Sequence, residues 1–304
     1  MTFAAAPSLA LDTPSSVLDL PGGRLDLTRH LAVMAIVNRT PDSFYDRGAT
    51  FALDAAVAAG VAAVEAGAEL VDVGGVKFAP GPPVPVEEEI ARVVPVVREL
   101  AHLTRVSVDT FQPKVARAAI EAGASVVNDT TGLHDPAMAT VVAQGGAGLV
   151  IAHSLAAPRT QHPLPHYADV IGDVARFLMA RRDLALDHGV PAERIVLDPG
   201  HDLNKTTRQS LELTRRLGEL AALGSPVLVA LSNKDFVGEA LGRDRGERLS
   251  GSLAAAVYCA LRGARIVRVH NVRETVDALR MVEAILGWRE PAYELHNTRP
   301  EGNA

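Results

Sequence analysis

Short apolar runs rich in Val, Ile and Leu alternate along this chain with longer, Ala-rich stretches of helical period. Runs of about four to eight apolar residues are typical of buried strands, and helical stretches between them are typical of crossover connections. This alternation predicts a parallel sheet whose strands are joined by helices. The apolar runs cover residues 31–37, 69–73, 105–109, 125–129, 147–153, 194–198, 226–232 and 265–270. The helices are expected to begin near Leu53, Pro85, Gln112, Pro136, Tyr167, Thr207, Arg245 and Val272.

Eight strand–helix units fit either a closed (β/α)₈ TIM barrel or an open doubly wound sheet. An open sheet usually has a Gly-rich phosphate-binding turn after its first strand. Neither G-x-G-x-x-G nor G-x-x-x-x-G-K-[ST] occurs anywhere in the sequence. The pattern therefore favours an α/β fold with a single TIM-barrel domain. We expect a flexible leader over residues 1–30, the barrel over 31–288 and a polar tail over 289–304.

The composition excludes two classes of partner. Thirty basic and 36 acidic residues give a net charge of −6, and aromatic residues make up only 4% of the chain. A nucleic acid or an anionic membrane is therefore not an expected partner, because both favour a basic surface. The N-terminal segment lacks the basic start and the apolar length of a targeting or membrane-spanning segment, so we expect a cytoplasmic protein. Cys259, the single cysteine, is expected to be buried in a helix.

Polar residues follow almost every apolar run, at the point where the predicted strand ends. In a TIM barrel these ends form the rim on which active sites are built. The strand-end residues are Asn38, Asp72, Asp109, Asn128, Asp129, His153, Asp198, Ser232, Lys234, Arg268 and His270. Asp72 and Asp129 are each interpreted as the N-cap of the following helix, a common role for Asp after a strand. The joint occurrence of the others predicts a binding pocket.

The rim residues divide into two chemical sets. One set offers the hydrogen-bond donors and acceptors that suit a planar heterocycle with an amino group beside a ring N–H and a carbonyl. This set is Asp109, Asn128, Asp198 and Lys234. The other set suits a polyanion such as a pyrophosphate, because Arg forms forked bonds to phosphate oxygens. It comprises Asn38, Arg268 and His270. An aminated heterocycle that carries a phosphate is the predicted ligand class.

Together these motifs resemble those of the dihydropteroate synthase family. The first loop, NRTPDSFYDRGA, is similar to the family's N-V-T-P-D-S-F-S-D-G-G, and the segments SVDT, NDTTG, DPG, LSNK, RLSGSLA and RVH follow in family order. The resemblance implies folate biosynthesis, through a reaction that joins 6-hydroxymethyl-dihydropterin pyrophosphate to p-aminobenzoate and releases pyrophosphate. It also implies a homodimer, and an Mg²⁺ ion bound with the pyrophosphate at Asn38.

Matched residue by residue, the resemblance assigns a role to each set. It implies that the pterin is held by Asp109, Asn128, Asp198 and Lys234. It implies that the pyrophosphate is held by Asn38, Arg268 and His270. The catalytic groups are then Lys234, Arg268 and His270, whose positive charge disperses the charge of the leaving pyrophosphate.

Two loops depart from the family pattern at the second-substrate site. Residues 74–81 read GGVKFAPG where the family has G-G-E-S-T-R-P-G, so Lys77 lies in a loop that lacks the family's Thr and Arg. The seventh loop reads SNKD where the family has S-R-K-S. Asn233 replaces the Arg, and Asp235 replaces the Ser that helps seat the p-aminobenzoate carboxylate near a helix N-terminus. Asp235 is expected to repel that carboxylate or to cap the helix itself.

Three functions are compatible with these residues. The first is a divergent paralogue that binds a pterin-like ligand and condenses it with p-aminobenzoate weakly or not at all. The second is an active dihydropteroate synthase, and the third is the pterin domain of a folate-dependent methyltransferase. The altered loops favour the divergent paralogue. Asn38, Arg268 and His270 argue against the methyltransferase, because that reaction needs no pyrophosphate site.

Overall fold

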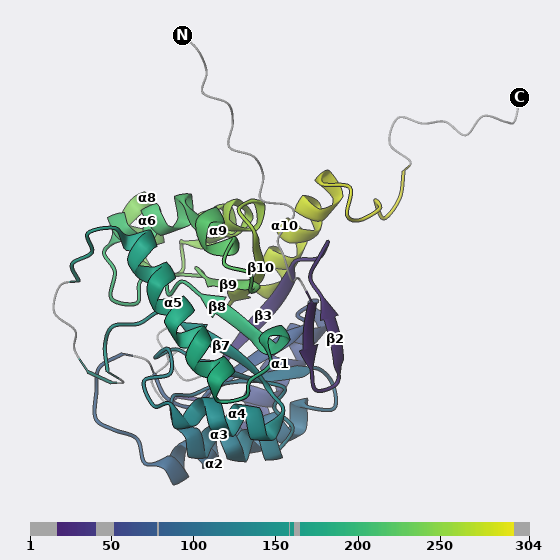
Figure 1. Cartoon of the computed structure of the whole chain (residues 1–304). Helices are drawn as coiled ribbons and strands as arrows, with labels where there is room; N and C mark the ends of the chain where they lie inside the picture. The colour runs from purple at the N-terminus through teal and green to yellow at the C-terminus, as the bar shows by residue number, and fades with distance from the viewer. Residues whose placement is uncertain (1–16, 41–51, 78, 158, 161–164, 295–304) are drawn as a thin grey trace, which may run out of the picture.

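The computed structural model contains a closed barrel of eight parallel strands surrounded by helices (Figure 1). It describes residues 17–40, 52–77, 79–157, 159–160 and 165–294. The barrel order is β10-β3-β4-β5-β6-β7-β8-β9, and pairing of β10 with β3 closes it. The predicted (β/α)₈ TIM barrel is therefore confirmed. The strands are β3 (Ala32–Asn38), β4 (Leu70–Gly74), β5 (Arg105–Asp109), β6 (Val126–Asp129), β7 (Gly148–Ala152), β8 (Ile195–Asp198), β9 (Val227–Ala230) and β10 (Ala264–Val269).

Helices connect successive strands and cover the outside of the barrel (Figure 1). They are α1 (Leu53–Glu65), α2 (Val86–Leu100), α3 (Pro113–Glu121), α4 (Ala137–Gly145), α5 (Val170–Asp187), η1 (Ala192–Arg194), α6 (Thr207–Arg215), α7 (Leu217–Ala221), α8 (Asp235–Leu241), α9 (Leu249–Leu261) and α10 (Val272–Ile285). The helix expected near Arg245 begins at Leu249, and the short helix α8 before it is not predicted by the sequence pattern. None of the described helices has both the length and the hydropathy needed to span a membrane.

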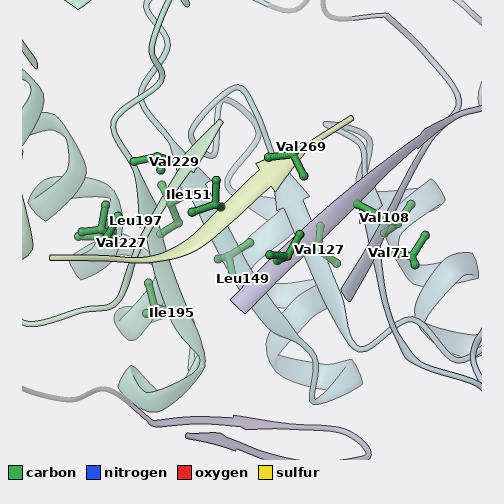
Figure 2. Packing of buried hydrophobic residues seen from close by; sticks show 14 of the residues in the cluster. Val71, Val108, Val127, Leu149, Ile151, Ile195, Leu197, Val227, Val229 and Val269 are labelled. Atoms are coloured by element: carbon green, nitrogen blue, oxygen red, sulfur yellow. The ribbon is translucent and has the colours of Figure 1, made fainter. Parts of the chain in front are cut away.

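Alternation along the strands gives the barrel two apolar layers. Val127 belongs to the layer between the sheet and the helices, whereas its neighbour Val126 belongs to the layer inside the barrel. Figure 2 shows part of the outer layer, including Val71 and Leu149. Cys259 is fully buried in the outer layer, as predicted, and burial raises the pKa of its thiol. The barrel interior is a packed core, so ligands are confined to the strand ends.

A β-hairpin closes the barrel at the end where the strands begin. It consists of β1 (Val17–Leu20) and β2 (Gly23–Asp26), which pair antiparallel. Its buried leucines pack against the first inward-facing side chains of the barrel strands. These leucines are Leu18, Leu20, Leu25 and Leu27. The prediction of a flexible leader up to residue 30 is therefore wrong for residues 17–30, because burial of these apolar side chains fixes the segment.

His30, just before β3, lies between two carboxylates. Its Nε2 is 2.8 Å from Oε2 of Glu69, and its Nδ1 is 3.1 Å from Oε1 of Glu283. The hydrogen bonds to Glu283 and Glu69 raise the pKa of His30 to about 9. The protonated ring stabilises the fold. Its contribution is therefore complete below the ordinary pKa of 6.5 and is lost as the pH rises through about 9.

We expect His30→Asn to lower the free energy of unfolding by about 1–2 kcal/mol at pH 6 and by much less at pH 10, with the partial exposure of the ring limiting the effect. Urea unfolding at both pH values measures the difference. Replacement of the exposed His102 by Asn is the control for the loss of a histidine ring. Equal losses at pH 6 and pH 10 for His30→Asn would contradict the assignment.

Candidate functional site

The period of two along each strand decides which strand-end side chains enter the barrel. Asn128 is two residues after the inward-facing Val126 and points inward, whereas Asp129 points outward. Asp129 accepts the N–H groups of Thr131 and Leu133, so its role is structural, although it stabilises the turn after β6 and not a helix N-terminus. The same spacing turns Asp72, Asp109, Asp198 and Arg268 into the barrel.

A cavity of about 690 Å³ at the C-terminal ends of the strands is lined by Asp109, Asn128, Asp198 and Arg268. The volume is in the usual range for a small-molecule site. The cavity brings together every residue assigned above to the two ligand-binding sets or to the altered loops. They are Asn38, Lys77, Asp109, Asn128, Asp198, Asn233, Lys234, Asp235, Arg268 and His270. The two predicted chemical sets and the altered loops therefore share one pocket.

Arg268 forms the centre of an ion-pair network at the floor of the cavity. Its Nε donates to Oδ2 of Asp72 at 2.6 Å, and its Nη2 donates to Oδ2 of Asp109 at 2.9 Å. Asn128 also donates to Oδ2 of Asp72, at 3.0 Å. The interpretation of Asp72 as a helix N-cap is therefore wrong, because its fully buried carboxylate faces the barrel interior. Its spacing of two residues from the inward-facing Leu70 is the sequence signal that identifies it.

Burial shifts the protonation of the other polar groups in the cavity. Burial, together with the nearby carboxylates, raises the pKa of Asp109 to about 7, even though Arg268 opposes the shift. Burial also raises the pKa of Asp198, while the charge of Lys234 lowers it. The pKa of Lys234 is lowered by burial, and its Nζ donates to the carbonyl of His201. Asp109 can therefore donate or accept a proton near neutral pH.

The side of the cavity next to β3 and β10 carries small polar groups. Asn38 and Thr40 line it, and the hydroxyl of Thr40 is buried without a hydrogen-bond partner in the described part of the chain. His270 donates its N–H to Oγ of Ser232 at 3.3 Å, and its Nδ1 lies 3.2 Å from the same oxygen. Pairing of β10 with β3 brings the two ends together.

Only part of the predicted first loop can be described. Residues 41–51, which carry most of the NRTPDSFYDRGA motif, lie outside the described residues. Within the described ranges, no group of three or more His, Cys, Asp or Glu side chains is placed to hold a metal ion.

Two carboxylates, those of Asp202 and Asp235, lie at the start of α8, where only Asp235 was predicted. Oδ2 of Asp202, from the loop after β8, accepts the backbone N–H of Phe236 at 3.1 Å. Asp235 does not cap the helix, and that prediction is wrong. Its Oδ1 lies 2.8 Å from Nη1 of Arg248 and 3.6 Å from Nη2 of Arg245, and the bond to Arg248 lowers its pKa. Asp202 does not follow from the strand-end pattern, because it lies beyond the end of β8, within a loop.

Lys205 fixes the loop after β8. Its buried Nζ donates to the carbonyls of Gly200 at 2.9 Å and Leu203 at 3.0 Å, and lies 2.9 Å from Nδ1 of His153. Burial lowers the pKa of Lys205 to about 7 and that of His153 to about 2, so the imidazole is neutral and accepts. His153, predicted on the rim, therefore supports the loop and does not line the cavity.

Comparison with known proteins gives a consistent assignment. A family model described as "Pterin binding enzyme" matches residues 34–270. A protein of Mycobacterium leprae (strain TN) named "Inactive dihydropteroate synthase 2" is 49% identical over 267 residues, spanning 85% of this chain and 92% of that protein. Dihydropteroate synthase of Escherichia coli (strain K12) is 40% identical over 272 residues, spanning 88% of this chain and 96% of that one.

Solved structures agree with this result. The structure of Xanthomonas albilineans dihydropteroate synthase with 4-aminobenzoic acid is similar with a TM-score of 0.82 and 42% identity, covering 90% of this chain and 98% of that one. Sequence and fold thus match over nearly the whole barrel, and the altered second and seventh loops distinguish this chain from the family pattern. The chain therefore belongs to the dihydropteroate synthase family, of which it is a divergent paralogue.

Proposed function

We propose that this chain binds a pterin that carries a pyrophosphate, and that it condenses this ligand with p-aminobenzoate weakly or not at all. One observation carries the proposal. The polar pocket at the strand ends is retained, while the start of α8 is occupied by the chain's own Asp202. The pocket supports pterin binding. The carboxylate of Asp202 disfavours a second carboxylate at the same place.

The pterin end of the proposal rests on buried groups that have hydrogen-bonding capacity left. Oδ1 of Asn128 is buried and has no hydrogen-bond partner among the described residues. An unpaired buried acceptor favours a ligand that donates to it. Asp109 and Asp198 add acceptors, or donors when protonated, for an amino group and ring N–H. Lys234 supplies a donor for a ring carbonyl or nitrogen.

The pyrophosphate end of the proposal involves Asn38, Arg268 and His270. The Nε and Nη2 atoms of Arg268 already donate to Asp72 and Asp109. Its Nη1 atom can donate to an anion. Mg²⁺ that binds with a phosphate usually takes only one or two oxygen ligands from the protein. The amide of Asn38 and the unpaired hydroxyl of Thr40 are suitable groups for this role. When bound, Mg²⁺ would neutralise part of the charge on the leaving pyrophosphate.

The residues at the expected p-aminobenzoate site disfavour condensation of the pterin with p-aminobenzoate. The Ser and Arg of the family motif are Asp235 and Asn233 here, and Asp202 adds a further carboxylate beside them. Like charges about 4 Å apart cost on the order of 1 kcal/mol in water and several at a half-buried site. The Mycobacterium leprae relative is itself named inactive, whereas the Xanthomonas albilineans enzyme was solved with 4-aminobenzoic acid.

An active synthase is the alternative, and the retained cationic groups favour it. Lys234, Arg268 and His270 all line the cavity, and each can stabilise negative charge as pyrophosphate leaves. A synthase requires in addition that p-aminobenzoate reach the exocyclic carbon of the pterin. The two functions therefore differ only in the second substrate.

Isothermal titration separates the two functions. We expect 6-hydroxymethyl-dihydropterin pyrophosphate with Mg²⁺ to bind with micromolar or tighter affinity, and we expect p-aminobenzoate to give no heat when it is added to this complex. Asp198→Asn is the control variant, and it should weaken pterin binding by about tenfold or more, because it replaces a buried carboxyl group by an amide with a different arrangement of donors and acceptors. Turnover at ordinary p-aminobenzoate concentrations would support the active synthase. Absence of pterin binding would refute both.

The family resemblance also supports a cytoplasmic homodimer. Met281 and Ile285 are exposed apolar side chains on α10, where they are available to a second copy. Sedimentation velocity gives the oligomeric state directly. No nucleic acid or membrane is expected among the partners.

A further inference from the structure

The second loop, between β4 and α2, forms one wall of the cavity without regular secondary structure of its own. Val76, Lys77, Ala79 and Pro80 contribute to this wall. The described part of the loop contains neither helix nor strand. A segment of this kind needs an external partner to hold its backbone in one place.

Arg159, from the fifth loop between β7 and α5, supplies that partner. Its Nη1 donates to the carbonyls of Lys77 at 2.8 Å and Ala79 at 2.7 Å. Its Nη2 donates to the carbonyl of Pro82 at 3.0 Å, and its own carbonyl accepts the N–H of Gly81 at 3.3 Å. One guanidinium therefore bridges three carbonyls along the second loop, a geometry that a lysine ammonium on a flexible stem does not reproduce.

Two local features show that the chain accommodates this contact. A Cβ atom on Gly81 would lie 2.4 Å from Nη2 of Arg159, so the absence of a side chain there gives the guanidinium its space. Arg159 itself has a φ of 60°, in the left-handed region that non-glycine residues rarely adopt. Backbone strain of this kind persists only where surrounding contacts compensate for it.

Described residues of the fifth loop on both sides of Arg159 are in turn fixed to the body of the barrel. Oδ1 of Asn204, in the loop after β8, accepts the N–H of Leu155 at 2.8 Å and of Ala156 at 3.0 Å. Tyr167 donates to the carbonyl of Asn204 at 2.9 Å. Arg159 thus connects the second loop to an anchored neighbour and not to another free segment.

We propose that Arg159 is a positioning residue that ties the second loop to the fifth loop and so holds the wall of the cavity in its ligand-binding position. It acts through the backbone of the second loop and does not itself line the cavity. The loop contact stands on its own geometry, whereas the identity of the ligand rests on the proposed function. The cavity wall is then formed before the ligand arrives.

Loss of this contact leaves the second loop to be ordered by the ligand. We expect Arg159→Ala to raise hydrogen exchange of the amides at 75–82 and tryptic cleavage after Lys77 by about tenfold, because three carbonyls of the loop lose their donor. Gly81→Ala should do the same while keeping the arginine, and Arg159→Lys should give an intermediate effect. Arg176→Ala removes an exposed arginine on α5 and should change neither measurement.

The ligand measurement completes the test. Dissociation of 6-hydroxymethyl-dihydropterin pyrophosphate with Mg²⁺ should be about tenfold faster from Arg159→Ala and Gly81→Ala, with little change in the association rate. Unchanged exchange and cleavage in both variants, or a loosened loop with an unchanged dissociation rate, would overturn the proposal. If the natural protein binds no pterin, the proposed function fails, and the ligand-free exchange and cleavage still decide whether Arg159 holds the loop.

Discussion

Asp202→Gly is expected to raise the affinity of the pterin-loaded protein for p-aminobenzoate by about tenfold or more, since it removes a carboxylate from the start of α8. The fold should tolerate the change. Asp202 has a φ of 62°, which glycine adopts readily, and this relief offsets part of the loss of two hydrogen bonds, from the N–H of Phe236 and from the hydroxyl of Ser210. Titration of p-aminobenzoate into protein saturated with the pterin pyrophosphate and Mg²⁺ measures the gain.

Matched variants separate the charge of Asp202 from its position. Asp202→Asn keeps an acceptor near Phe236 without the charge, and should recover only part of the affinity. Asp235→Ser alone should have a smaller effect, because Arg248 and Arg245 already offset that carboxylate. Asp187→Asn, on the exposed end of α5, is the control. A gain in p-aminobenzoate affinity from Asp235→Ser that exceeds the gain from Asp202→Gly would show that Asp235, and not Asp202, is the main obstacle to the substrate carboxylate.

Arg268→Met is expected to lower the free energy of unfolding by about 3–5 kcal/mol at pH 8, because it leaves the fully buried Asp72 and the partly buried Asp109 without their cationic partner. Pterin binding should be lost as well. Asp72 and Asp109 both depend on this guanidinium, at 2.6 Å and 2.9 Å. Urea unfolding measures the stability, and the double variant with Asp109→Asn should recover part of it, since one of the two uncompensated charges is then absent.

The loss caused by Arg268→Met should be smaller at pH 5.5 than at pH 8. The folded protein holds the proton of Asp109 up to a pKa of about 7, whereas the ordinary pKa is 3.8. Between these values the folded state binds more protons than the unfolded state, so stability falls as the pH rises. Removing the positive charge of Arg268 raises the pKa of Asp109 further. Equal losses at the two pH values would contradict this assignment of the charge.

The sequence predicts the barrel well because its strands are buried on both sides. Continuous apolar runs separated by helical stretches have few alternative interpretations, and every predicted strand overlaps an observed one. The N-terminal hairpin is different. Its strands of four residues each, Val17–Leu20 and Gly23–Asp26, are too short to be told from an irregular leader, and only the barrel interior gives their leucines a place to be buried.

In the candidate site, the residues at strand ends could be predicted from the sequence, and the residues in loops could not. The rim residues follow from the rule that strand ends build the pocket, and the period of two would also have identified Asp72 as inward-facing. Asp202 and Arg159 could not be found in this way. Both residues lie in loops and have a positive φ. Arg159 binds backbone carbonyls of the second loop and Asp202 binds a backbone N–H of α8, so their contacts exist only after these segments are folded together.

Closure of the barrel pairs two strands from opposite ends of the chain, Ala32–Asn38 and Ala264–Val269. Chain synthesis adds ~5–20 residues per second, so the second strand is made roughly ten to fifty seconds after the first. Throughout that interval the hydrogen-bonding edge of the first strand is open to pairing with another chain. Aggregation through this edge is therefore a hazard of the nascent polypeptide that closure of the barrel removes, and it grows with the time by which the last strand is delayed.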